Sequence, residues 1–95
     1  MHFMLHGLDK PDALPVRLAH YDAHRAYIAA APVKIIVSGP LVSDDGTRMI
    51  GSFILMEAES RDQVVAFNRA DPFYQAGVWE RVDIHRCEKR VDNRA

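Results

Sequence analysis

The sequence contains very little cysteine and no cluster of basic residues, and both features narrow the class of protein. Cys87 is the only cysteine among 95 residues, so the chain can form no internal disulfide bond. The 12 Lys and Arg residues are balanced by 13 Asp and Glu residues. Nucleic-acid binding normally requires clustered positive charge. We therefore expect a protein of a reducing compartment that does not bind nucleic acid.

Long apolar runs are also missing. No stretch approaches the roughly 18 consecutive apolar residues of a membrane-spanning helix. Residues 1–6 lack the basic start and the apolar centre of a signal peptide. The composition is that of a globular protein, with 48% hydrophobic and 26% charged residues. We expect residues 1–95 to form one cytoplasmic domain with no membrane partner.

The pattern of apolar residues and turn signals predicts alternating strands and helices. β-Branched runs favour strands, and apolar spacing with abundant alanine favours helices. The predicted strands cover residues 2–8, 33–38, 48–58 and 78–88, and the predicted helices cover residues 13–30 and a segment from 60 to the break at 71–73. The order βαββαβ is that of a ferredoxin-like α+β fold with a four-stranded antiparallel sheet.

Local signals place the ends of these elements. Asp12 is expected to cap the first helix, and Pro32 to end it. Ser60 and Gln63 have the spacing of a capping box at the start of the second helix. Gly39-Pro40 is expected to bend the second strand or end its pairing. The turn residues 44–46 (Asp-Asp-Gly) predict a hairpin between the second and third strands.

Apolar side chains occupy both faces of the predicted sheet. In the third strand, Phe53 and Leu55 alternate with Ile54 and Met56, and in the second strand Val33, Ile35 and Val37 should share one face. Helices cover only one face of this fold, and a large uncovered apolar face usually marks an interface. We therefore predict a homodimer packed sheet on sheet, with larger assemblies of dimers left open. The alternative is that the C-terminal tail covers this face.

Few residues suggest chemistry from spacing alone. His20 and His24 lie four residues apart in the first predicted helix and would share a face. No third ligand follows at a diagnostic spacing, so we predict no metal site. Asp71, immediately before Pro72, is by itself typical of a turn.

An ordered set of segments resembles the YciI-like (YCII-related) family across roughly residues 3–88. The segments are Arg17–His24, Ser38–Leu41, Ala70–Phe73 and Gly77-Val78. The resemblance implies a dimeric α+β barrel and an active site that pairs a helix histidine with an aspartate, here His24 and Asp71. Some relatives resemble enzymes of aromatic degradation, including dehydrochlorination, and the wider superfamily includes proteins similar to muconolactone isomerase.

Two departures from the family pattern leave the substrate open. Arg25 stands where leucine is common, and Ala31-Pro32-Val33 replaces a turn that commonly contains glycine.

The resemblance leads to a functional hypothesis. A carboxylate bonded to one imidazole nitrogen fixes the tautomer and makes the other nitrogen a better proton acceptor. We predict a lyase or isomerase that needs no cofactor and acts on a small substrate, with an aromatic ring as one candidate. His24 and Asp71 would be catalytic, and Ser38 and Phe73 would line the substrate cleft. The alternative is a dimeric module that binds a small ligand, or assists another enzyme, without catalysis. A third possibility, a haem-free monooxygenase, follows from fold analogy alone.

Overall fold

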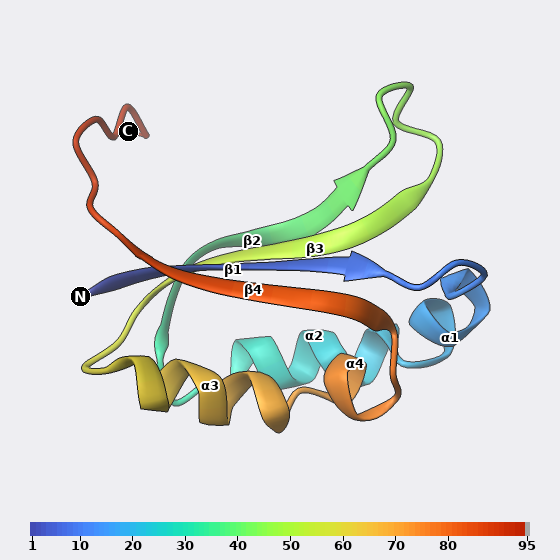
Figure 1. The fold of residues 1–95 in the computed structure, drawn as a ribbon, viewed down its shortest axis with the longest axis horizontal. Helices are drawn as coiled ribbons and strands as arrows, with labels where there is room; N and C mark the ends of the chain where they lie inside the picture. Colours follow the sequence, from blue (N-terminus) through green and yellow to red (C-terminus); the bar gives the residue numbers. More distant parts are fainter. Residues whose placement is uncertain (95) are drawn as a thin grey trace.

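The computed structural model describes residues 1–94, which form one four-stranded antiparallel sheet with every helix on the same face (Figure 1). The strand order is β2-β3-β1-β4, so β2 and β4 are the edges. The strands are β1 (His2–Asp9), β2 (Lys34–Val42), β3 (Met49–Glu57) and β4 (Trp79–Cys87), and the helices are α1 (Leu14–Ala19), α2 (Tyr21–Ala29), α3 (Arg61–Arg69) and α4 (Pro72–Gln75). This arrangement confirms the predicted ferredoxin-like α+β fold. Among the described residues, no helix is long and apolar enough to cross a membrane.

The prediction of a single helix over residues 13–30 is wrong, because this segment forms two helices that meet at His20. His20 is both the C-cap residue of α1 and the N-cap residue of α2, and its backbone angles are φ −107° and ψ 7°. The alanine-rich composition favours an uninterrupted helix, but tertiary contacts override that preference. Arg17 of α1 is anchored to Asp9 and Ser52 of the sheet.

The two predicted helix caps have different outcomes. Asp12 does not cap α1: it has a positive φ of 62°, and the capping position is Ala13, with no side-chain hydrogen bond. Asp tolerates this left-handed conformation better than most residues, so Asp12 serves the turn instead. The Ser60 cap is confirmed, because Gln63 N donates to Ser60 Oγ at 3.2 Å. The Gln63 side chain reaches back to accept from Glu59 N at 2.9 Å.

A β-bulge in β2 changes which side chains face the helices. Ile35 pairs with Met56 but Val37 pairs with Leu55, so Ile36 is an extra residue in the edge strand. Val37 therefore faces away from Ile35, and the prediction that they share a face is wrong. The same shift pairs Ser38 with Ile54, and directly opposed residues share a face. The bulge thus turns Ser38 toward the helices.

Gly39-Pro40 was expected to bend β2 or to end its pairing, and the second alternative is wrong because the pairing of β2 continues through both residues. Gly39 pairs with Phe53 and Pro40 with Ser52, and β2 extends to Val42. Proline is compatible with this position because β2 is an edge strand. It pairs with a neighbouring strand on one side only, so a residue without an N–H group is tolerated there.

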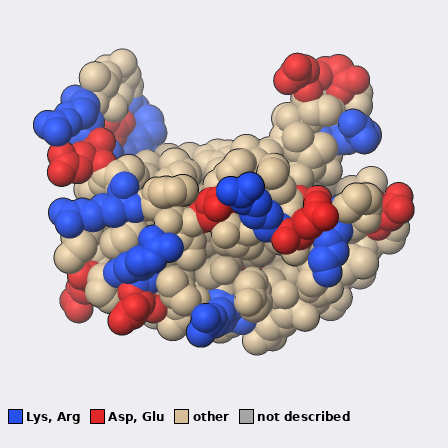
Figure 2. Space-filling model, in the orientation of Figure 1, with Lys and Arg blue, Asp and Glu red and all other residues tan. Residues whose placement is uncertain are grey.

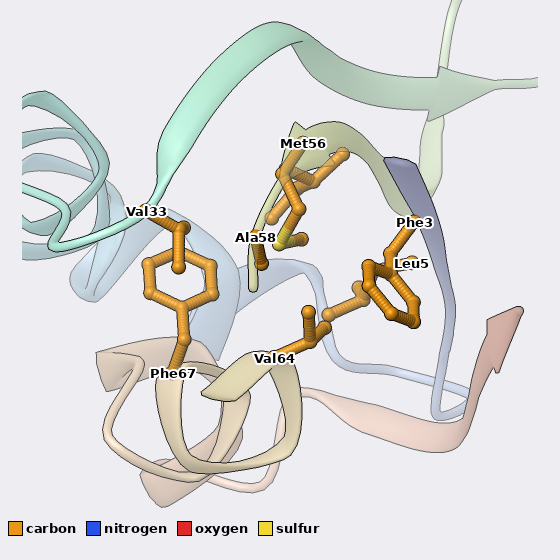
Figure 3. Packing of buried hydrophobic residues seen from close by; sticks show 8 residues of the cluster. Phe3, Leu5, Val33, Met56, Ala58, Val64 and Phe67 are labelled. Carbon is orange, nitrogen blue, oxygen red and sulfur yellow. The ribbon is translucent and has the colours of Figure 1, made fainter. Parts of the chain in front are cut away.

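The main hydrophobic core lies between the sheet and α3 (Figure 3). Its buried members are Phe3, Leu5, Val33, Ile54, Met56, Ala58, Val64 and Phe67. A smaller cluster of Ala13, Phe73, Val78 and Trp79 lies around α4. Trp79 packs so closely on Gly7 that a Cβ there would come within 2.9 Å of the indole.

The face of the sheet opposite the helices is uncovered (Figure 1). The hairpin tip and the C-terminal segment project beyond this face, and the upper edge between them carries no charged residues in Figure 2. Met4, Phe53 and Leu55 on this face are only partly buried. Val91, the large apolar residue of the tail, is 77% exposed. Within residues 1–94 the tail therefore leaves this face uncovered.

Candidate active site

A cavity of about 440 Å³ opens between α2, β2 and α4, a volume typical of small-molecule sites. His24, Ser38 and Phe73 line it, as do Arg17, Tyr21 and Arg25. Asp71 lies directly beside His24. The structure therefore brings together all four residues that the sequence analysis assigned to a site, although they come from distant parts of the chain.

His24 is hydrogen-bonded to the buried carboxylate of Asp71. His24 Nδ1 lies 2.8 Å from Asp71 Oδ1, and this oxygen also accepts from Phe73 N at 2.9 Å. The Asp71 side chain is 1% exposed and caps α4. The donor in this bond depends on the imidazole tautomer: an ionised Asp71 carboxylate can only accept, which would place the proton on His24 Nδ1. Nε2, which has no protein partner among residues 1–94, would then carry the lone pair.

Phe73 fixes the plane of the imidazole. The two rings stack with centroids 3.9 Å apart and an interplanar angle of 6°. Trp79 meets the Phe73 ring edge-on at 6.0 Å. Phe73 is only 1% exposed, so its ring mainly contacts other protein groups. Its clearest contribution to the site is therefore to orient His24.

Ser38 reaches the cavity only because of the bulge at Ile36. It lies on β2 opposite Ile54, on the helix-covered face. Within the described part of the chain, its hydroxyl makes no hydrogen bond to a protein group. This hydroxyl is therefore free to bond a molecule in the cavity.

Arg17 is a site residue that the sequence reasoning missed. Its side chain is 4% exposed, and it binds the Asp9 carboxylate through Nε at 2.8 Å and Nη2 at 2.9 Å. Nη2 also donates to Ser52 Oγ at 2.8 Å. The guanidinium lies over the Phe73 ring, 4.8 Å from its centroid. The available signal was an arginine within the apolar pattern of a helix and an acid at the end of the first strand.

Tyr27 packs behind the site and is structural. Its hydroxyl donates to the Phe67 carbonyl at 2.7 Å, and its ring stacks on Phe67. Burial, and next the negative charge of Asp71, raise the pKa of the Tyr27 phenol. The phenol therefore stays protonated at neutral pH and keeps donating this bond, which ties α2 to α3.

Metal ligation has no support in the described part of the chain. No group of three or more His, Cys, Asp or Glu side chains among residues 1–94 is placed to hold a metal ion. His20 is the N-cap residue of α2, and its carbonyl oxygen accepts a hydrogen bond from His24 N at 3.0 Å, so the two histidines are one turn apart without a third ligand among residues 1–94.

The chain is similar to a solved enzyme structure over almost its full length. 5-Chloro-2-hydroxyhydroquinone dehydrochlorinase (TftG) from Burkholderia phenoliruptrix AC1100, in complex with 2,5-dihydroxybenzoquinone, is 39% identical. The match covers 93% of this chain and 94% of that chain, with a TM-score of 0.85. An uncharacterized NIPSNAP domain protein from Burkholderia xenovorans shares the fold at 16% identity and a TM-score of 0.51.

Sequence comparison gives the same family. Protein YciI from Escherichia coli O6:H1 is 29% identical over 96 residues, covering 94% of this chain and 98% of that protein. The model of the YCII-related domain matches residues 1–88. The chain therefore belongs to the YCII-related family.

Proposed function

We propose that this protein is a lyase or isomerase in which His24 transfers a proton to and from a small substrate. The observation that carries the proposal is the 2.8 Å bond from His24 Nδ1 to a buried carboxylate, on an imidazole that lines a cavity. This bond directs the unprotonated Nε2 to act as the base. Asp71 would hold the tautomer and stabilise the imidazolium once it forms.

The chemistry can be written without a cofactor. Nε2 accepts a proton from a C–H or O–H group of the substrate, and the electron pair left behind forms a new double bond. In an elimination, a leaving group departs from the substrate with its own bonding pair. In an isomerisation, the imidazolium returns the proton to a different atom. Positioned acid/base catalysis of this kind contributes about 10²- to 10⁴-fold in rate.

The similarity to TftG supports the elimination form. TftG is named a dehydrochlorinase, and its structure holds 2,5-dihydroxybenzoquinone, a small oxygenated ring. The cavity of about 440 Å³ is large enough for a single ring. The Ser38 hydroxyl would form a hydrogen bond with a substrate oxygen, while stacking on Phe73 holds the His24 ring in its orientation.

Chloride release from 5-chloro-2-hydroxyhydroquinone under anaerobic conditions tests this proposal. We expect the His24→Gln variant to lower kcat by about 10²- to 10⁴-fold, because the proton acceptor is gone. His20→Gln is the matched control, since it removes a nearby histidine that does not line the cavity. Turnover by His24→Gln at the wild-type rate would rule out the proposed role. Absence of chloride release by the wild-type protein would reject this substrate.

One observation favours a non-catalytic binding module as the second candidate. Asp71 Oδ1 bonds both His24 and Phe73 N, so the pair also fastens α2 to α4. In that case the protein would bind ring compounds in the cavity and release them chemically unchanged. His24→Gln would then lower the melting temperature without affecting any reaction.

We also infer that the protein acts as a homodimer formed through the uncovered sheet face. Partly buried apolar side chains on this face, among them Met4, Phe53 and Leu55, remain in contact with water in the single chain. Removing apolar surface from water contributes roughly 25 cal/mol per Å². A second copy of the same face would bury these side chains, as in sheet-on-sheet packing. Assemblies of such dimers fit the same inference.

A further inference from the structure

The charged groups on the cavity wall are of one sign. Arg17 and Arg25 line the cavity, and no Asp or Glu among residues 1–94 does. Two acids bind residues of the wall without lining the cavity themselves: Asp9 is bound to Arg17, and Asp71 to His24. The surface that a ligand meets therefore offers cationic donors and the His24 imidazole, with apolar walls from Ile28, Pro40 and Met49.

Arg17 keeps unused hydrogen-bond donors although it is nearly fully buried. Nε makes one bond and Nη2 makes two, to Asp9 and Ser52. The two N–H groups of Nη1 have no hydrogen-bond partner among residues 1–94. Nη1 is also not among the fully buried polar atoms that lack a partner, so it is not shut off from the cavity. Because Arg17 lines the cavity, these donors are available to a ligand there. The Asp9 bond holds them in a fixed orientation.

Arg25 supplies the net positive charge. It lies on α2, one residue after His24, and its guanidinium is 5.6 Å from the centre of the Tyr21 ring. Unlike Arg17, it forms no ion pair with a carboxylate in the described chain. An unpaired guanidinium at a cavity mouth raises the local concentration of anions and can bond an anionic oxygen directly.

The geometry points to a cavity that selects small organic anions: a compact apolar or aromatic body bearing a carboxylate, phenolate or enolate oxygen. The nearly buried Arg17 would donate from inside the cavity, and the exposed Arg25 from its rim. This inference rests on the proposed function in one respect, because it takes the cavity beside His24 to be the substrate site. Beyond that function, we infer that the substrate is negatively charged and that Arg25 is the residue that selects for this charge.

A matched pair of probes separates charge from shape. 4-Hydroxybenzoate and 4-hydroxybenzamide have nearly the same size and differ in charge, and NMR titration of the intact protein measures both dissociation constants. We expect the wild-type protein to bind the anion more tightly. We expect Arg25→Gln to weaken binding of the anion about tenfold and to leave the amide unchanged. Raising the salt concentration should narrow the difference between the wild-type protein and Arg25→Gln.

The control is Arg69→Gln, which removes the same charge from the end of α3, outside this cavity. Equal binding of both probes by the wild-type protein would overturn the inference. So would loss of anion affinity in Arg69→Gln equal to that in Arg25→Gln, or failure of both probes to shift the His24 signals. None of these outcomes touches the proton-transfer proposal, which stands or falls on chloride release by His24→Gln.

Discussion

At the scale of single residues, the buried pair Arg17–Asp9 is an ion pair whose disruption should be costly. The two side chains are 4% and 7% exposed and share two hydrogen bonds. Replacing Asp9 by Asn leaves a buried guanidinium without its counter-charge. We expect this change to lower the free energy of unfolding by about 3–5 kcal/mol, measured by urea denaturation.

The control for Asp9→Asn is Glu88→Gln, which breaks an exposed ion pair with Arg90. An exposed pair contributes about 0–1 kcal/mol, so this variant should be nearly as stable as the wild-type protein. Equal stability of the Asp9→Asn and Glu88→Gln variants would show that Arg17 does not depend on Asp9.

The hairpin residue Asp45 predicts a local pH dependence. Its carboxylate accepts hydrogen bonds from Ser43 Oγ and from Thr47 Oγ1 and N, and these bonds lower its pKa from 3.8 to about 2. A pKa that is lower in the folded state contributes stability above pH 3.8, and this is lost as the pH falls toward 2. We expect the Thr47 amide resonance to titrate with a midpoint near 2. A midpoint near 3.8 would contradict these bonds.

The residues of the site were predictable only to a limited extent. His24 and Asp71 were assigned from a resemblance, because spacing alone gave Asp71 a role in a turn. That role is real too, since Asp71 caps α4. Arg17 was missed because a lone arginine in a helix is usually solvated. Its burial depends on Asp9 and Ser52, which only the folded sheet brings near.

At the scale of elements, two glycines on the uncovered face test how closely the strands approach. A Cβ at Gly51 would lie 2.3 Å from the Gly7 carbonyl oxygen, a backbone atom that cannot move aside. A Cβ at Gly39 would lie 3.3 Å from the edge of the Phe53 ring, which can adjust. We expect Gly51→Ala to lower the free energy of unfolding by about 1–3 kcal/mol and Gly39→Ala to cost less. Equal losses in urea denaturation would contradict the close strand approach.

The type and order of the elements followed from local patterns, but two features of their geometry did not. The bulge at Ile36 could not be predicted, because residues 35–37 are all apolar and each of them could lie on either face of the sheet. The break at His20 opposes the helical preference of the surrounding alanines. Both depend on contacts with other parts of the chain. The bulge also shapes the cavity, because it places Ser38 on the helix-covered face.

At the scale of the whole molecule, the uncovered sheet face predicts self-association. Leu55 lies in β3 on this face and is partly buried in the single chain. We expect the wild-type protein to be dimeric or larger by light scattering. Leu55→Glu should be monomeric, because a carboxylate would be buried in the interface. Val91→Glu, in the exposed tail, is the control and should assemble normally.

Proton transfer by His24 requires an unprotonated Nε2 that faces the cavity. Long-range ¹H–¹⁵N NMR of the histidine side chains, assigned with His24→Gln, measures this at a pH where the imidazole is neutral. We expect the neutral His24 to carry its proton on Nδ1, where it bonds Asp71, and Asp71→Asn to disturb this state. A neutral His24 imidazole protonated on Nε2 in the wild-type protein would rule out Nε2 as the proton acceptor.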